Sequence, residues 1–280
     1  INPFSGKEGI WEILDAPVRK RIAVVGAGPA GLQAAWILGK RGHDVTVYEK
    51  EENAGGQYRI AAVPPMKQDL AKTISTYLTF CHKYHVTIHY HTKADKKLLD
   101  QGNFDEIILA CGASPLVPEI KGINQKHVYL AKDILSFHVL LQNQRIIVLG
   151  AGLVGVETAE VLAGYGNSVT VVDMLEKAAP LAPARPRENL MGHLKELGVQ
   201  FVLGRRVTEI HEDGVSCEKA GEVKRLEGFD SIVLAFGSRS DRALAEEYGD
   251  DRRVHLIADA LESGDATRRV YEATKLALSL

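Results

Sequence analysis

The chain has 280 residues, a length that allows two domains with separate hydrophobic cores. Apolar residues make up 45% of the chain and charged residues 25%, which is ordinary for a globular protein. The 34 basic and 36 acidic residues give a formal net charge of -2. This balance argues against a nucleic-acid or anionic-membrane partner, and no apolar run reaches the roughly 18 residues that cross a bilayer.

The N-terminal segment INPFSGKEGIWEI has neither the basic start nor the continuous apolar stretch of a signal peptide. The chain begins with Ile1 instead of Met, and we interpret it as a fragment of a longer protein. The three cysteines, Cys81, Cys111 and Cys217, form no CxxC pair. This spacing argues against a zinc ribbon or a local redox disulfide, and such sparse cysteine usage predicts a cytoplasmic location.

The first recognisable unit is RIAVVGAGPAGLQAAWILGKRGHDVTVYEK, residues 21–50. Its apolar run 22–25 predicts a short, buried parallel strand. Gly26, Gly28 and Gly31 then give the spacing GxGxxG. The first glycine permits a tight turn, the second lets the backbone approach a pyrophosphate, and the third lets the following helix pack on the strand.

The rest of this unit strengthens a motif that is weak on its own. We expect a helix whose N-terminal N–H groups face the phosphates. A second strand, 44–49, ends at Glu49, which follows Gly28 by 21 residues. An acid at this distance accepts hydrogen bonds from ribose hydroxyls, so the unit predicts a dinucleotide site.

A histidine-rich stretch, residues 80–93, raises the alternative of a metal site around Cys81. Two histidines have helical spacing and two have strand spacing, namely His82 with His85 and His89 with His91. The two pairs would lie on different elements, whereas zinc needs four converging ligands. We therefore predict a solvated strand edge and no metal site.

The second unit, residues 145–174, repeats the first at an offset of 124 residues. Between residues 22–50 and 146–174, 12 of 29 positions are identical. The glycines correspond to Gly150, Gly152 and Gly155, and the acid corresponds to Asp173. Two dinucleotide sites in one chain predict an electron donor and an electron acceptor that are both nucleotides.

This order of motifs resembles the pyridine nucleotide–disulfide oxidoreductase superfamily, in which the FAD site comes first and the NAD(P) site is inserted. The resemblance implies an α/β fold with two Rossmann-like, doubly wound lobes. The FAD lobe would comprise residues 1–115 and 240–280, and the NAD(P) lobe would comprise 116–239. Further matches are NAGGQY (53–58) and two strand-and-glycine segments, 104–118 and 229–241.

The two ends of the chain resemble a narrower group, the C-terminal module of old yellow enzyme-like multidomain reductases. These include 2,4-dienoyl-CoA reductase and trimethylamine dehydrogenase. The matching segments are INPFSGKEG, VHLIADA and RRVYEATKLAL. The resemblance implies a barrel domain with FMN and an Fe–S cluster, both absent from this chain, and a homo-oligomer formed through the full-length protein.

The resemblance also implies the site residues, all of them cofactor-binding and none catalytic, because flavin itself accepts the hydride. Asp259 would bind the ribityl or phosphate region of FAD, although Ala258 replaces the usual preceding glycine. Cys111 replaces a usual threonine and is interpreted as a packing residue. The FAD residues would be Gly26, Gly28, Pro29, Ala30, Gly31, Glu49, Lys50, Gly56, Gln57, Lys93, Ala110, Cys111, Gly112 and Asp259. The NAD(P) residues would be Gly150, Gly152, Leu153, Val154, Gly155 and Asp173.

Three questions stay open at this stage. Asp173 favours NADH over NADPH, whereas Arg185 and Arg187 could fold back onto a 2′-phosphate. The first site could hold ADP in a binding module without redox activity, as in trimethylamine dehydrogenase. A small subunit of the glutamate synthase type is a further enzyme alternative. Our main expectation is transfer of hydride from NAD(P)H to FAD, and of electrons onward to the barrel domain.

Overall fold

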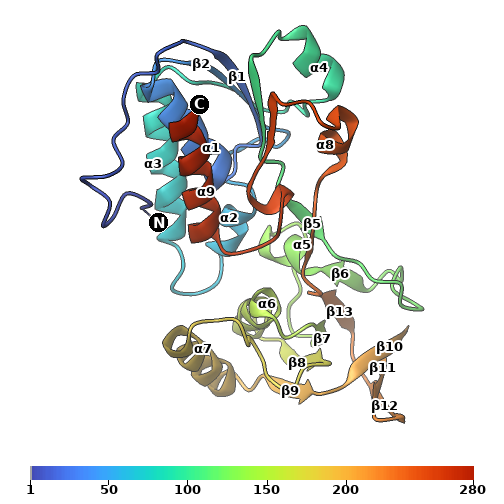
Figure 1. Ribbon diagram of the computed structural model, residues 1–280. Coiled ribbons are helices and arrows are strands. Elements are labelled where there is room, and N and C mark those ends of the chain that lie inside the picture. Colours follow the sequence, from blue (N-terminus) through green and yellow to red (C-terminus); the bar gives the residue numbers. More distant parts are fainter. Residues whose placement is uncertain (1) are drawn as a thin grey trace. The chain divides into compact units, whose positions relative to one another are not determined.

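The computed structural model describes residues 2–280 (Figure 1). The chain divides into two compact units. The first comprises the residues up to Ala62, Asp69–Ser114 and Arg239–Leu280, and the second comprises Val63–Gln68 and Pro115–Ser238. Residues 63–68 therefore group with the second unit, although the sequence prediction includes them in the first lobe.

The first unit is built on a five-stranded parallel sheet in the order β15-β4-β1-β2-β3. Its strands are β1 (Arg21–Val25), β2 (Asp44–Tyr48), β3 (Thr87–His89), β4 (Glu106–Leu109) and β15 (Val254–Leu256). Its helices are α1 (Pro29–Lys40), α2 (Gln57–Ala61), α3 (Leu70–Lys83), α4 (Lys96–Gln101), α8 (Ala243–Tyr248) and α9 (Ala266–Ser279), with a 3₁₀ turn η1 (Ala258–Ala260). Helices α1, α3 and α9 lie together on one face of the sheet (Figure 1).

Successive residues of β1 supply two different cores, because side chains alternate between the faces of a strand. Ile22 and Val24 pack with the helices α1, α3 and α9. Ala23 and Val25 pack on the opposite face with residues of α4 and α8. A strand that is buried on both faces has a continuous run of apolar residues. This run made the strand predictable from the sequence.

The second unit contains a second five-stranded parallel sheet, in the order β6-β13-β7-β8-β9. Its strands are β6 (Val128–Leu130), β7 (Arg145–Leu149), β8 (Ser168–Asp173), β9 (Gln200–Leu203) and β13 (Ser231–Leu234), and its helices are α5 (Ala131–Leu135), α6 (Leu153–Gly164) and α7 (Ala184–Glu196). An antiparallel sheet follows, made of β10 (Arg206–His211), β11 (Gly214–Lys219) and β12 (Glu222–Glu227). The short strands β5 (Ala113–Pro115) and β14 (Ser238–Ser240) pair where the chain passes between the units.

The same alternation divides the core of the second unit. Ile146 and Val148 of β7 pack with helices α5, α6 and α7. Ile147 and Leu149 pack on the other face, where the antiparallel sheet contributes Val215 and other apolar residues. The predicted α/β class with two Rossmann-like lobes is confirmed. Within residues 2–280, no helix is both long enough and apolar enough to span a membrane.

Candidate functional site

The three motif positions of the first unit need glycine for different reasons. Gly26 has φ +104°, and a Cβ there would lie 2.4 Å from the carbonyl oxygen of Ala110. A Cβ on Gly31 would lie 2.0 Å from the carbonyl oxygen of Gly26, so this glycine lets α1 approach the turn. A Cβ on Gly28 would meet nothing within 4 Å. The packing of the chain therefore requires Gly26 and Gly31, whereas only a ligand would require Gly28.

Glu49 lies directly after β2 with 5% of its surface exposed. Its Oε2 accepts a hydrogen bond from the N–H of Ala27 at 2.7 Å, and its Oε1 accepts one from the N–H of Glu51 at 2.9 Å. These two bonds fix the carboxylate beside the glycine turn. A carboxylate has about four lone-pair positions, so it retains the capacity to accept hydrogen bonds from hydroxyl groups.

The double-glycine segment packs against the glycine turn. The N–H of Gly55 donates to the carbonyl oxygen of Ala27 at 2.8 Å. A Cβ on Gly56 would lie 3.7 Å from the Cα of Gly28. The side chain of Gln57 donates to the carbonyl oxygen of Ala113 at 2.6 Å, which ties this segment to the residues that follow β4.

Two more predicted segments reach the same edge of the sheet, because the carboxyl ends of parallel strands lie together. Ala110, Cys111 and Gly112 follow β4 directly, and Asp259 lies shortly after β15, the strand paired with β4. The N–H of Ile257 donates to the carbonyl oxygen of Leu109 at 3.0 Å, which holds the ends of β15 and β4 side by side. Burial raises the pKa of the Cys111 thiol to about 11, so the thiol is neutral near pH 7.

The remaining predicted residues of the first unit border these segments. Pro29 is the first residue of α1 and Ala30 is buried in its first turn. Lys50 and Lys93 have exposed side chains. Lys93 follows Thr92, whose N–H donates to the carbonyl oxygen of Glu49 at 2.8 Å.

The glycine turn of the second unit repeats the geometry of the first. Gly150 has φ +112°, and a Cβ there would lie 2.3 Å from the carbonyl oxygen of Ala235. A Cβ on Gly155 would lie 1.9 Å from the carbonyl oxygen of Gly150, whereas one on Gly152 would meet nothing within 4 Å. In both units the middle glycine faces open space.

Asp173 is held in the same way as Glu49. Its Oδ2 accepts from the N–H of Ala151 at 2.5 Å, and its Oδ1 accepts from the N–H of Leu175 at 2.8 Å. The N–H of Ala179 donates to the carbonyl oxygen of Ala151, as Gly55 donates to Ala27. The structural repeat therefore extends past the identical residues, to Gly55 and Ala179.

Two apolar side chains at the start of α6 are exposed beside this turn, Leu153 by 44% and Val154 by 51%. The alternative of an arginine clamp for a 2′-phosphate depends on Arg185 and Arg187. Arg187 donates through Nε to the carbonyl oxygen of Ala178 at 2.8 Å, and Arg185 is exposed. The Arg187 side chain is thus bonded to the backbone of the loop that precedes α7.

The geometry of both glycine turns suits a dinucleotide. A methyl group at Gly28 or Gly152 would have room in the protein, so each glycine leaves a surface that a phosphate can approach closely. Each lies immediately before the N-terminus of a 12-residue helix, α1 or α6, whose first N–H groups attract anions. A fixed carboxylate stands beside each turn.

The sequence prediction omitted three charged residues in these units. Glu157, two residues after Gly155, is buried on α6 and forms an ion pair with Lys67. Burial raises the pKa of Glu157, and Lys67 opposes that shift. Arg269 on α9 is also buried. In the sequence it stands beside Arg268 and close to Glu272, so no pattern there marks it as a buried residue.

The histidine-rich stretch spans a helix and a strand, but His85 and His91 lie just beyond them, with φ +58° and φ +51°. His82 lies on α3, and His89 lies on β3, where its ring stacks on Tyr48 at a centroid distance of 5.5 Å. Cys81 is buried and donates its S–H toward Leu32. Over residues 2–280, no group of three or more histidine, cysteine, aspartate or glutamate side chains gathers as metal ligands do.

Comparison with known proteins identifies the family. Residues 20–259 match the pyridine nucleotide-disulphide oxidoreductase family. The whole chain is 33% identical to bilirubin reductase of Mediterraneibacter gnavus, and 94% of it is 35% identical to NADH oxidase of Thermoanaerobacter brockii. The chain spans 44% and 43% of those two proteins.

A solved structure gives the same result. The structure of a 2-naphthoyl-CoA reductase matches 100% of this chain with a TM-score of 0.93 and 28% identity, and the match covers 43% of that protein. The predicted resemblance to a module of longer reductases is thus confirmed. Members of the family bind FAD and NAD(P)H, and the predicted class of enzyme, an FAD-dependent oxidoreductase, is confirmed as well. The chain belongs to the pyridine nucleotide-disulphide oxidoreductase family.

Proposed function

We propose that the first unit binds FAD, that the second unit binds NADH, and that the chain transfers reducing equivalents from the nicotinamide to the flavin. The observation that carries this proposal is the duplicated turn. Each unit has a middle glycine open to a ligand and a carboxylate fixed by two backbone N–H groups. Two such sites in one chain suit a donor and an acceptor that both contain a nucleotide.

Residues of the first unit would bind the two ends of FAD differently. The turn at Gly28 and the first N–H groups of α1 would hold the pyrophosphate, and Glu49 would accept the adenosine ribose hydroxyls. Gly56, which packs against that turn, would line the path to the flavin together with Gln57 and Asp259. When bound, FAD supplies the redox chemistry, since its flavin accepts electrons from a reduced nicotinamide. The chain needs no acid–base pair for that step.

Asp173 supports NADH as the electron donor. Its carboxylate is fixed beside the turn at Gly152, where it would accept hydrogen bonds from a free 2′-hydroxyl and repel a 2′-phosphate. Arg187 is bonded to the backbone of Ala178 and does not compensate for that repulsion in the described structure. We therefore propose NADH over NADPH.

The longer protein would pass the electrons onward from FAD, through an Fe–S cluster, to FMN in a barrel domain. The support for this step is that the relatives named above are more than twice as long as the matched region. They are named as a bilirubin reductase, an NADH oxidase and a 2-naphthoyl-CoA reductase. These names differ in their substrates, which suggests that the final substrate is selected outside this module. We propose that the longer protein is a cytoplasmic multidomain reductase.

A second candidate is a module that binds ADP in the first unit and performs no redox step. Ala258 favours it, because this residue adopts φ +56° where a glycine would be unstrained. Its methyl group precedes Asp259, the residue proposed to face the flavin end of the cofactor. ADP would need only the turn at Gly28 and Glu49.

Steady-state kinetics of the purified chain with added FAD separate the two candidates. With ferricyanide as acceptor, we expect oxidation of NADH that depends on FAD, with a higher kcat/KM than for NADPH. Turnover equal with both nucleotides would contradict the role of Asp173. A chain that binds ADP but shows no FAD-dependent turnover would support the binding module instead.

A further inference from the structure

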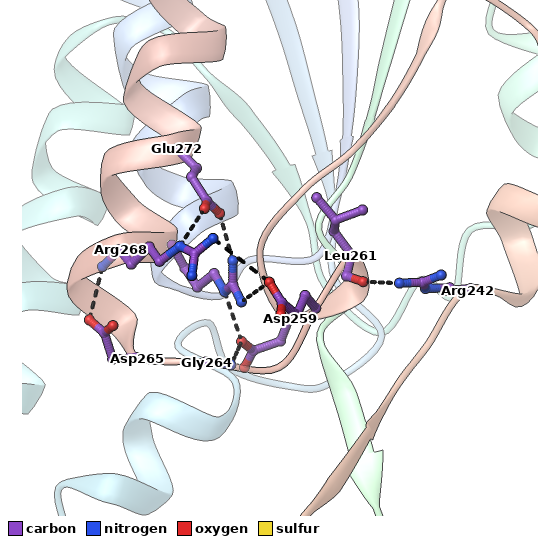
Figure 2. Close-up of polar contacts among 9 residues, drawn as sticks. Arg242, Asp259, Leu261, Gly264, Asp265, Arg268 and Glu272 are labelled. Atoms are coloured by element: carbon purple, nitrogen blue, oxygen red, sulfur yellow. Dashed lines mark hydrogen bonds and ion pairs between the residues drawn. The ribbon is translucent and has the colours of Figure 1, made fainter. Parts of the chain in front are cut away.

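The last loop of the first unit carries a compact group of charges, shown in Figure 2. Asp259 lies in η1, and its side chain is 29% exposed. Its Oδ1 accepts a hydrogen bond from the N–H of Gly264 at 3.1 Å. Asp265 then caps α9 by accepting from the N–H of Arg268 at 3.0 Å. The loop thus folds back so that the start of α9 lies beside Asp259.

Arg269 lies behind this loop with only 4% of its side chain exposed. Its Nη1 donates to Glu272 at 2.8 Å, and its Nη2 lies 3.4 Å from Glu262. Its Nε lies 3.7 Å from Oδ1 of Asp259 and has no hydrogen-bond partner among the described residues. Burying a guanidinium whose Nε lacks a hydrogen bond costs free energy of folding. The fold therefore holds Arg269 here at the expense of some stability.

The distance between Nε and Asp259 matters because it exceeds a hydrogen bond. At 3.7 Å the positive charge attracts the carboxylate without occupying one of its lone pairs. The charge of Arg269 therefore balances the negative charge of Asp259. The partly exposed carboxylate oxygens keep the capacity to accept hydrogen bonds from a ligand.

Gly264 makes this close packing possible. A Cβ at this position would lie 2.6 Å from Nη2 of Arg269, so the guanidinium rests directly on the backbone of the loop. The same residue donates its N–H to Asp259. Arg269 thus contacts the loop at the residue that orients the carboxylate, and it attracts the carboxylate as well.

Burial and the charge of Arg269 act in opposite directions on the pKa of Asp259. Burial raises the pKa of Asp259, and the Gly264 N–H and the charge of Arg269 oppose that rise. Glu262 from the loop and Glu272 from α9 face the same guanidinium, and Arg268 lies 3.0 Å from Glu272. Without Arg269, a half-buried Asp259 would stand near two further carboxylates.

We propose that Arg269 is a positioning residue for FAD, which holds Asp259 charged and oriented so that its carboxylate accepts hydrogen bonds from hydroxyl groups of the cofactor. The proposal rests on the proposed function, in which Asp259 faces FAD. Arg269 itself would not touch the cofactor. If the charge of Asp259 were removed, Arg269 would no longer contribute to FAD binding.

The test is a titration of the full chain with FAD, followed by flavin fluorescence, over a pH range that extends from pH 8 down toward the ordinary pKa of an aspartate, roughly 4. We expect Arg269→Met to weaken FAD binding roughly ten- to a hundredfold, the effect of losing a hydrogen bond to a charged group. The loss of affinity on acidification should begin at a higher pH than in the wild type, because Asp259 then takes up a proton more readily. Arg268→Met is the matched control. It removes the adjacent, exposed arginine and should change the affinity less than about twofold.

Two further variants separate positioning from a merely structural role. Arg269→Lys keeps the charge, so it should restore the wild-type pH profile even where affinity stays reduced, and it also serves if Arg269→Met fails to fold. In an Asp259→Asn background, Arg269→Met should have little additional effect on FAD binding. Full additivity of the two changes, or wild-type affinity and pH profile in Arg269→Met, would overturn the proposal. A wild-type chain that binds no FAD would instead overturn the proposed function and the role of Arg269 with it.

Discussion

Replacing Gly28 with alanine should separate ligand binding from folding. Gly28 has φ -72° and ψ 177°, which alanine adopts readily, and its Cβ would meet nothing within 4 Å. The loss of unfolded-state freedom stabilises such a variant by about 0.4–1 kcal/mol, but alanine caps a helix less well than glycine by a similar amount. The free energy of unfolding of Gly28→Ala should therefore stay within about 1 kcal/mol of the wild type.

Gly31→Ala is the matched comparison at the same turn. Its Cβ would lie 2.0 Å from the carbonyl oxygen of Gly26, a backbone atom that cannot move without distorting the turn. Overpacking of this kind costs about 1–3 kcal/mol or more. For a chain of this size, each kcal/mol corresponds to roughly 2–4 °C in Tm. We expect Gly31→Ala to lower Tm clearly, and Gly28→Ala to change it little.

FAD binding, unlike stability, should be strongly weakened in Gly28→Ala. A methyl group at Gly28 would push the pyrophosphate away from the backbone N–H groups, and each such bond to a charged group contributes about 1.5–3 kcal/mol. Titration with FAD should show affinity roughly ten- to a hundredfold lower in Gly28→Ala. Thermal unfolding without FAD gives the stability. If Gly28→Ala unfolds as readily as Gly31→Ala, or binds FAD like the wild type, the assignment of these glycines is wrong.

Three further predictions concern the second unit and the thiol. Gly152→Ala should raise the Kd for NADH, measured by fluorescence titration, while the Kd for FAD stays the same; a change in the FAD value would contradict separate sites. Asp173→Asn removes the charge but keeps an acceptor for a backbone N–H, so the ratio of kcat/KM for NADH over NADPH should fall roughly tenfold or more; an unchanged ratio would place specificity elsewhere. Because burial raises the pKa of Cys111 to about 11, only about one thiol in a thousand is ionised at pH 8. Iodoacetamide should thus label Cys111 slowly below pH 9 and faster above pH 10, and rapid labelling at pH 7 would show a reactive thiol.

The sequence predicted the parts of the structure that are encoded by neighbouring residues. The buried run 22–25, the glycine turn and Glu49 all lie within 30 residues, and the second copy repeats them. The prediction of Asp259 came from a family resemblance, because its proximity to the glycine turn depends on strand β15 pairing with β4. The structure also explains the glycine that usually precedes it, since Ala258 occupies the left-handed region at φ +56°.

The parts that the sequence did not reveal depend on distant contacts. The antiparallel sheet β10–β12 was not predicted, although two-residue turns join its strands, Glu212–Asp213 and Ala220–Gly221, and a glycine as the second turn residue is a hairpin signal. The polar strand β12 has no apolar alternation to mark it. Arg269 read as one of several charges in a helix, because the acids around it lie in a loop that only the fold brings together. The grouping of residues 63–68 with the second unit likewise depends on a contact across the sequence, from Lys67 to Glu157.

The most direct test of the central claim is an anaerobic absorption spectrum of the purified chain, taken after FAD is added and again after NADH is added. We predict that FAD remains with the chain through gel filtration and that its flavin bands then bleach on addition of NADH, with NADPH less effective. Flavin bands that do not bleach would contradict electron transfer between the two sites. A chain that retains no FAD, but is stabilised against heat by ADP, would show that the first unit is an adenosine-binding site and that the redox account is wrong.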